Sequence, residues 1–266
     1  MSVFLNEAAR KIIDETADVA GFLWQRGWAE RNAGNISVRM AGEDIAESCS
    51  SQQEQLIPLT KRFQELGGNF FLVTGKNTRM RDVAARPIEN MLVIRLSDEG
   101  TGFYILSPDG ETALHPTSEL SAHLDIHSMI ARRKMEQRVV MHTHATELVA
   151  LTHIKELCNE VQLNRVLWGM HPETKVFVPA GAGFVPYLLP GTTAIGEATV
   201  RVLEKHDIAI WEKHGVFAIG KTPSETFDMI DILTKSASVY FLCRSAGFDP
   251  EGLTDSQLDE LGELKF

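Results

Sequence analysis

An apolar segment that ends in two histidines, Val139–His144, constrains this chain more than any other. Side chains two residues apart in a β-strand point to the same face of the sheet. His142 and His144 can therefore reach one metal ion, while Thr143 faces the opposite side. Neutral imidazole suits Zn²⁺, so we expect a strand whose end supplies two ligands of a zinc site.

A catalytic zinc site uses three protein ligands and keeps one coordination position open. His214 is the best candidate for the third ligand, because it lies in a turn between two expected strands and Gly215 relieves crowding there, but the spacing gives no firm reason to prefer it over the other histidines. Paired histidines are also common as surface or packed residues, and the spacing alone leaves that alternative open. His123 and His127, four apart in an expected helix, are a second pair that could bind a metal. The remaining histidines are interpreted as helix-face or loop residues: His115, His153, His171 and His206.

The rest of the chain alternates helical patterns with short apolar runs that are typical of strands. Helices are expected at residues 4–29, 116–133, 145–155, 193–205 and 222–245. Strands are expected at residues 36–40, 70–73, 91–96, 102–106, 139–144, 176–178, 208–211 and 215–219, with irregular segments at 41–67 and 179–191. Because the sequence has no internal repeat and no clear linker, we expect one α/β domain over residues 1–266, with helices covering a mixed sheet.

Composition narrows the class of protein and its partners. Hydrophobic residues make up 44% and charged residues 23%, as in an ordinary globular protein. No run approaches the roughly 20 apolar residues that cross a bilayer, and acidic residues such as Glu7 occupy the region where a signal peptide needs an apolar run. The three cysteines, Cys49, Cys158 and Cys243, form no CxxC pair. We therefore expect a cytoplasmic protein with free thiols and no membrane partner.

The formal net charge of −10 argues against a nucleic-acid partner, which would need a basic face. It does not exclude a small anionic substrate, because backbone N–H groups and a few side chains can hold one phosphate. Residues 32–35, 74–77 and 117–118 could each contribute to such a pocket. Each could equally be an ordinary turn between strands, so the prediction depends on their converging in space.

Glu119 follows two hydroxyl residues at the expected start of a helix. One interpretation is a capping carboxylate that accepts from the N–H groups of the first helical turn. The other is a general base held near the metal ion. The residues alone do not separate the two.

Six segments in this order resemble the class II aldolase family of sugar-phosphate enzymes: residues 30–39, 71–76, 115–120, 139–146, 189–196 and 211–220. The resemblance spans nearly the whole chain. It implies a three-layer α/β/α domain with a central mixed, mostly antiparallel sheet, and a homotetramer with active sites at subunit interfaces.

The resemblance also implies roles for particular residues. His142, His144 and His214 would bind one Zn²⁺ per subunit, and Glu119 would be the catalytic acid/base. Glu173 would be a second carboxylate that reaches the site of a neighbouring subunit. The substrate phosphate would be held by Asn32, Asn35, Gly75, Lys76, Thr117 and Ser118, where Lys76 replaces the small hydroxyl residue that is more usual in the family.

The implied activity is reversible cleavage of L-rhamnulose 1-phosphate to dihydroxyacetone phosphate and L-lactaldehyde. The nearest alternative is an aldolase for another deoxyketose 1-phosphate, such as L-fuculose 1-phosphate. A pentulose-phosphate 4-epimerase fits less well, because those relatives lack the acid at the position of Glu119. A non-catalytic assembly domain like the adducin head, and a purely structural zinc site, are the alternatives from other classes.

Overall fold

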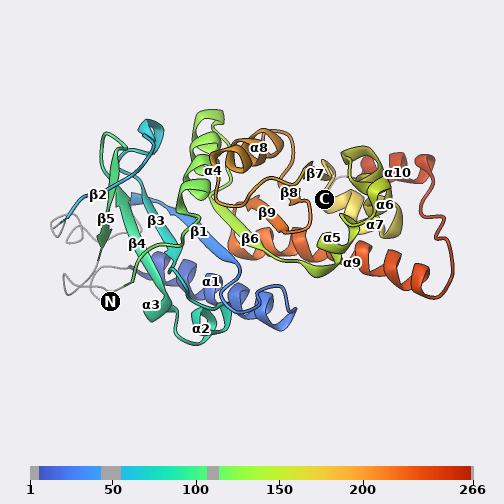
Figure 1. The fold of residues 1–266 in the computed structure, drawn as a ribbon, viewed down its shortest axis with the longest axis horizontal. Helices are drawn as coiled ribbons and strands as arrows, with labels where there is room; N and C mark the ends of the chain where they lie inside the picture. Colours follow the sequence, from blue (N-terminus) through green and yellow to red (C-terminus); the bar gives the residue numbers. More distant parts are fainter. Residues whose placement is uncertain (1–5, 43–54, 107–113, 265–266) are drawn as a thin grey trace. The chain divides into compact units, whose positions relative to one another are not determined.

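The computed structural model describes residues 6–42, 55–106 and 114–264. The chain folds into α-helices and a mixed, mostly antiparallel set of strands (Figure 1). It divides into two compact units, Met1–Thr143 with Gly220–Ser224 and His144–Ile219 with Glu225–Phe266. Cys49 lies outside the described residues. Among the described helices, none combines the length and the apolar character that a bilayer crossing requires.

Among the described residues of the first unit, six strands form the sheet, and every pair of neighbours among them is antiparallel. In spatial order they are β2 (Ile57–Pro58), β5 (Gly102–Leu106), β4 (Met91–Leu96), β3 (Phe70–Thr74), β1 (Asn35–Met40) and β6 (Val139–Thr143). The central strands are almost continuously apolar because both faces are covered, and all five residues of β6 are buried. The β1–β6 register places Asn35 opposite His142.

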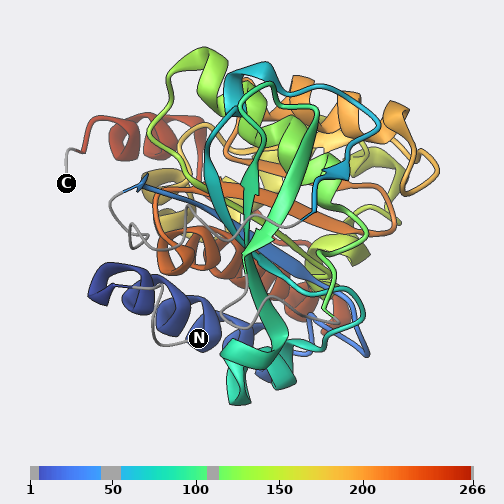
Figure 2. The same cartoon turned by 90° about the vertical axis from the view of Figure 1, so that its left-hand side faces the viewer.

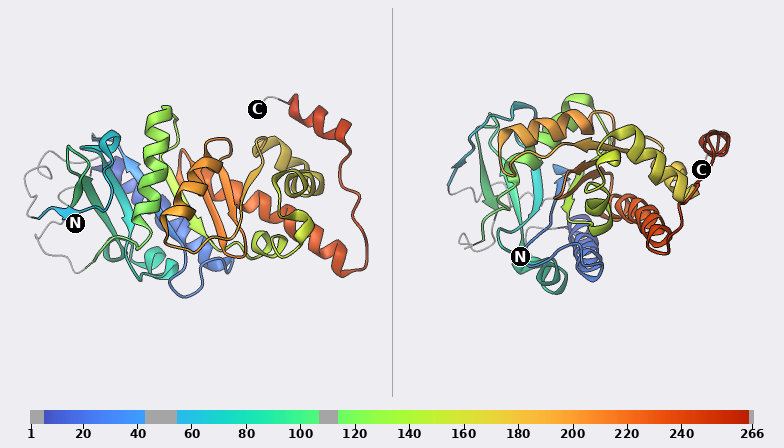
Figure 3. Two further views of the ribbon diagram at one scale, coloured as in Figure 1. Left: turned by 45° about the horizontal axis from the view of Figure 1, so that its top comes forward. Right: turned by 45° about the vertical axis from the view of Figure 1, so that its right-hand side comes forward.

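Helices cover both faces of this sheet. On one side lie α1 (Glu7–Gln25), α2 (Met80–Ala85) and α3 (Pro87–Asn90), which pack against one another and group together in Figure 2. On the other side lies α4 (Leu120–Arg133), as the left-hand view of Figure 3 shows. The apolar stripe expected over 4–29 accounts for α1, which begins after Asn6, whose side chain accepts from Ala9 N at 3.0 Å.

The start of α4 is anchored in the core of the first unit. Leu120 and Leu124 belong to a cluster of buried side chains that also includes Phe71, Val73 and Ile94. Burying one leucine side chain contributes about 1.5–3 kcal/mol. This packing fixes the position of the residue just before the helix, Glu119.

The second unit is built on three strands. β8 (Ile208–Trp211) pairs antiparallel with β9 (Gly215–Gly220) and parallel with β7 (Ala182–Val185). Figure 1 shows α8 and α9 on opposite sides of these strands. The helices are α5 (Thr146–Leu151), α6 (Glu160–Met170), α7 (Pro172–Phe177), α8 (Thr193–Leu203), α9 (Pro223–Ser245) and α10 (Asp255–Gly262), with short 3-10 turns at Lys155–Leu157 and, in the first unit, at Gln64–Leu66.

The strand expected at residues 176–178 is wrong. Pro172 starts a helix there, α7, and the strand is β7, inside the segment expected to be a loop. A three-residue apolar run does not distinguish helix from strand by its periodicity. β7 in turn contains Gly183, where a Cβ would lie 2.2 Å from Val202 Cγ1 of α8. The close approach of α8 thus requires a residue that weakens the strand signal.

The predicted fold class is confirmed. The sheet is mixed, because β7–β8 is parallel, and mostly antiparallel, with helices on both faces. The single domain expected over residues 1–266 stays a prediction.

Candidate metal centre and active site

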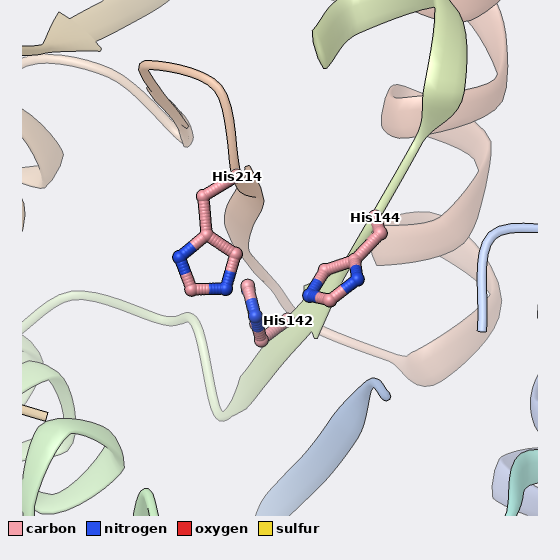
Figure 4. Close-up of side chains that lie close together, drawn as sticks. All are labelled: His142, His144 and His214. Atoms are coloured by element: carbon pink, nitrogen blue, oxygen red, sulfur yellow. The ribbon is translucent and has the colours of Figure 1, made fainter. Parts of the chain in front are cut away.

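Three histidines form a group of potential metal ligands. One ring nitrogen from each of His142, His144 and His214 lies within 4.8 Å of the others, and Figure 4 shows the rings turned toward one another. Among the described residues this is the one group of at least three His, Cys, Asp or Glu side chains that could hold an ion. His142 is the last residue but one of β6, and chain connectivity keeps His144 beside it. Thr143 points away, and its hydroxyl donates to Trp28 O at 2.8 Å.

The turn between β8 and β9 holds the third histidine. Lys213 takes a left-handed conformation with φ 59°, and its N–H donates to Thr152 Oγ1 at 2.8 Å. The His214 ring packs edge-on against Trp211, with ring centroids 5.1 Å apart, and against His144 at 5.0 Å. The left-handed backbone conformation in this turn is at Lys213.

The donor set fits a zinc ion. Three imidazole nitrogens from protein side chains, with no fourth ligand among the described residues, match the catalytic arrangement of three protein ligands and an open position. His142 is buried, whereas His144 and His214 are partly exposed. Imidazole also accepts other transition metals, so the donor set defines the class of ion and not its identity.

Glu119 lies next to this group without belonging to it. Its Oε2 atom is 3.9 Å from His142 Nε2 and accepts a hydrogen bond from Asn35 Nδ2 at 2.6 Å. Glu119 occupies the N-cap position of α4, yet its side chain makes no capping hydrogen bond. The capping interpretation is therefore wrong, and the carboxylate lies beside His142.

The pair His123 and His127 does not form a second metal set. His123 Nδ1 lies 2.7 Å and His127 Nε2 lies 2.9 Å from the same atom, Ser37 Oγ, and His123 Nε2 bonds Asn35 Oδ1. Both rings are fully buried. These hydrogen bonds engage three of the four ring nitrogens within the protein.

The three segments predicted to hold phosphate do converge. Gly75 forms a β-bridge with Pro116, and Thr117 N donates to Thr74 O at 3.0 Å. Ile36 N donates to Thr74 Oγ1 at 3.1 Å, which brings the start of β1 to the same place. This convergence satisfies the condition on which the prediction of a phosphate pocket depends.

The convergence also limits which groups remain for a phosphate. The N–H groups of Gly75, Lys76 and Thr117 already donate to the carbonyls of Asn90, His115 and Thr74 at 2.9, 2.7 and 3.0 Å. An anion would therefore depend on side chains and not on these amides, contrary to our expectation of a backbone cradle. Asn32, Lys76 and Ser118 are exposed and Thr117 and Asn35 are buried.

Glu173 lies on the first turn of α7 and is exposed. Its Oε2 atom is 3.1 Å from His171 Nε2. Among the described residues it is not part of the metal-ligand group. Its role at a neighbouring subunit stays a prediction.

Sequence reasoning did not assign a role to Ser37, and it treated His123 and His127 only as possible metal ligands. One feature of the sequence could have indicated a role for Ser37. Ser37 is a small polar residue inside an apolar strand, two positions after Asn35 and hence on the same face. Such a residue needs a partner when it is buried.

Comparison with known proteins identifies the family of this chain. The family described as "Class II Aldolase and Adducin N-terminal domain" matches residues 14–241, and the chain belongs to this family. The rhamnulose-1-phosphate aldolase of Bacteroides thetaiotaomicron is 38% identical over 260 residues, which cover 96% of this chain and 94% of that protein. The enzyme of the same name from Listeria monocytogenes serotype 4b (strain F2365) is 39% identical over 254 residues, covering 94% and 92%.

A solved structure shares the fold. The crystal structure of a sugar-phosphate aldolase from Thermotoga maritima superposes with a TM-score of 0.76 at 30% identity, covering 91% of this chain and 99% of that one. The resemblance to class II aldolases inferred from six segments is confirmed.

Proposed function

We propose that the protein is a zinc-dependent aldolase that reversibly cleaves L-rhamnulose 1-phosphate to dihydroxyacetone phosphate and L-lactaldehyde. The observation that carries the proposal is the group of three histidines with a glutamate carboxylate 3.9 Å from one of them that is not itself part of the group. The full-length similarity to relatives named rhamnulose-1-phosphate aldolase supports the choice of substrate.

In this proposal His142, His144 and His214 hold one zinc ion per subunit. When bound, zinc supplies a Lewis acid that polarises a carbonyl oxygen and offsets the negative charge that develops as the carbon–carbon bond breaks. A lysine that forms a Schiff base is then not required.

Glu119 transfers the proton in this reaction. Its carboxyl group, when protonated, gives a proton to the carbon freed when the bond breaks, while the hydroxyl that becomes the aldehyde oxygen loses a proton, so the number of protons is unchanged. In the direction of synthesis the carboxylate removes the proton from that carbon. The position of Glu119 supports this role, because its Oε2 atom is oriented by Asn35 and lies beside the proposed ligands. A carboxylate that bound the metal itself would be a poorer base.

The substrate phosphate binds where the three segments converge. Thr117, Ser118 and Lys76 supply hydroxyl and ammonium donors, and Asn32, Asn35 and Gly75 complete the wall of the pocket. The ammonium of Lys76 meets the doubly charged phosphate as a point charge. Anchoring the phosphate holds the reacting carbons over the three histidines.

The assembly is proposed from the family alone. One domain over residues 1–266 forms a cytoplasmic homotetramer with active sites at subunit interfaces, and Glu173 reaches a neighbouring subunit's site. Neither a nucleic acid nor a membrane is a partner in this proposal. The two cysteines described by the structure, Cys158 and Cys243, are free thiols, in keeping with a reducing compartment.

Cleavage assays with metal analysis of the same sample test the proposal. L-rhamnulose 1-phosphate and L-fuculose 1-phosphate are supplied side by side, and dihydroxyacetone phosphate is measured. We expect about one zinc per subunit and a higher kcat/KM for L-rhamnulose 1-phosphate. Preference for the fucose-derived substrate would reassign the substrate, and a metal-free, inactive protein would favour an assembly domain.

A further inference from the structure

A line of buried polar side chains runs from α4 across β1 and ends at Glu119. His127 Nε2 is 2.9 Å from Ser37 Oγ, which is 2.7 Å from His123 Nδ1. The other nitrogen of His123 bonds Asn35 Oδ1, and Asn35 Nδ2 donates to Glu119 Oε2 at 2.6 Å. Four of the five residues are buried, and only Glu119 has a partly exposed side chain.

Burial favours the neutral form of both histidines of this line. Burial lowers the pKa of His123 to about 4, and burial lowers the pKa of His127 well below its ordinary value. A neutral imidazole carries one N–H donor and one acceptor nitrogen. Each ring can therefore donate a hydrogen bond through only one of its two nitrogens.

The donor and the acceptor of each hydrogen bond in the line can be assigned by starting from the carboxylate of Glu119. An ionised carboxylate only accepts, so Asn35 presents its NH₂ group to Glu119 and its Oδ1 to His123. His123 must then carry its proton on Nε2, and its Nδ1 accepts from the hydroxyl of Ser37. With its hydrogen used, Ser37 Oγ accepts from Nε2–H of His127.

The same assignment can be made by starting from His127, at the opposite end of the line. His127 Nδ1 is buried and has no hydrogen-bond partner among the described residues. An N–H at that atom would be an unpaired buried donor, which proteins avoid. The proton of His127 therefore lies on Nε2, toward Ser37. Two independent arguments give the same tautomer.

We propose that His123 is a positioning residue for Glu119, and that Ser37 and His127 fix its tautomer. The inference rests on the proposed function, in which Glu119 transfers the proton. The amide of Asn35 can in principle turn over and place its oxygen against the carboxylate. A donor at His123 Nε2 excludes that orientation, because Asn35 must keep its oxygen on the His123 side. Every hydrogen of the line thus points toward Glu119, and the carboxylate always has its N–H donor.

Removing the hydroxyl of Ser37 tests this role. Ser37→Ala leaves His123 Nδ1 without a donor, so either tautomer becomes possible and the Asn35 amide loses its fixed orientation. We expect kcat to fall about 10- to 100-fold, a loss no larger than that expected for removing the general base itself, with KM and zinc content near the wild-type values. Ser37→Thr keeps a hydroxyl and should recover most of the loss.

Ser128→Ala is the matched control. Ser128 is a buried serine of α4, one residue after His127, and its hydroxyl donates to Glu65 Oε1 outside the line. If the buried hydroxyls matter only for packing, the two alanine variants should change kcat alike. Equal effects, or a Ser37→Ala variant whose loss lies in KM, would overturn the proposal.

Neutron diffraction of the zinc-loaded wild-type protein gives a measurement that does not depend on any variant folding. We expect hydrogen on Nε2 of both His123 and His127, and a hydrogen on Nδ1 of either ring would refute the proposal.

Kinetic assays of Glu119→Gln separate a failure of the proposed function from a failure of the positioning role. If Glu119→Gln keeps its turnover, the role of Glu119 fails. If Glu119→Gln is inactive and Ser37→Ala is not impaired, only the positioning role fails.

Discussion

The carboxylate of Glu119 lies 3.9 Å from the imidazole of His142, although one residue precedes α4 and the other is the last residue but one of β6. Asn35 links the two, because it lies opposite His142 in the β1–β6 register and donates to Glu119 at 2.6 Å. The position of the proposed base relative to the proposed ligands is thus set by strand pairing and one side-chain hydrogen bond.

Glu119→Gln should retain zinc and lose at least ~10²-fold in kcat, the usual range for a general base. Glutamine keeps the size of the side chain and can accept from Asn35, but it cannot take up a proton. Zinc per subunit and steady-state cleavage rates measure the two effects. Near-normal turnover would assign the proton transfer to another group.

His214→Ala should lose most of the bound zinc and the activity, because two imidazoles rarely hold the ion against chelators. His153→Ala is the control, since His153 is an exposed histidine of the same unit. Treating the wild-type protein with EDTA should reproduce the loss, and added Zn²⁺ should restore the activity. Full activity of the metal-free protein would contradict the proposed function.

Lys76→Ala should raise KM with a smaller change in kcat. A hydrogen bond to a charged group contributes about 1.5–3 kcal/mol, which corresponds to a factor of about ten or more. Lys205→Ala removes an exposed lysine outside the three converging segments and should leave KM unchanged. Competitive inhibition by inorganic phosphate should weaken in parallel. An unchanged KM would place the phosphate away from Lys76.

Stability toward unfolding should fall as the pH falls from about 6.5 to about 4, the interval between the ordinary pKa of histidine and the lowered pKa of His123. In this interval the unfolded chain binds protons that the buried neutral rings do not, so the folded state loses up to about 1.4 kcal/mol per pH unit for each such histidine. Urea unfolding at several pH values measures the slope. His127→Gln keeps an N–H donor but does not titrate, so it should show a shallower slope. Equal slopes would mean that His127 is not held neutral by the fold.

The sequence predicted most of the elements that carry the site. The strands that carry Asn35 and His142 and the turn that carries His214 follow from apolar runs with clear ends. The strand β7 could not be predicted, because the glycine required by the approach of α8 removes the local signal. The helices α2, α3, α6 and α10 were also not predicted.

The features of the site that could not be predicted depend on contacts between residues far apart in the sequence. Sequence spacing could not show that Gly75 pairs with Pro116, nor that the amides of the expected phosphate cradle are already engaged. The partners of Ser37 are 86 and 90 residues away in the chain, so its role becomes visible only in three dimensions.

The pairing of Asn35 with His142 has a consequence for how the protein should be assayed. If β1 slipped by one residue against β6, Asn35 and Ser37 would turn to the opposite face of the sheet. The three histidines lie outside β1 and would still be able to capture an ion. A misregistered chain would therefore count as fully metallated while lacking an oriented base. Zinc content alone would then overstate the active fraction of a preparation, and active-site titration would distinguish the two kinds of chain.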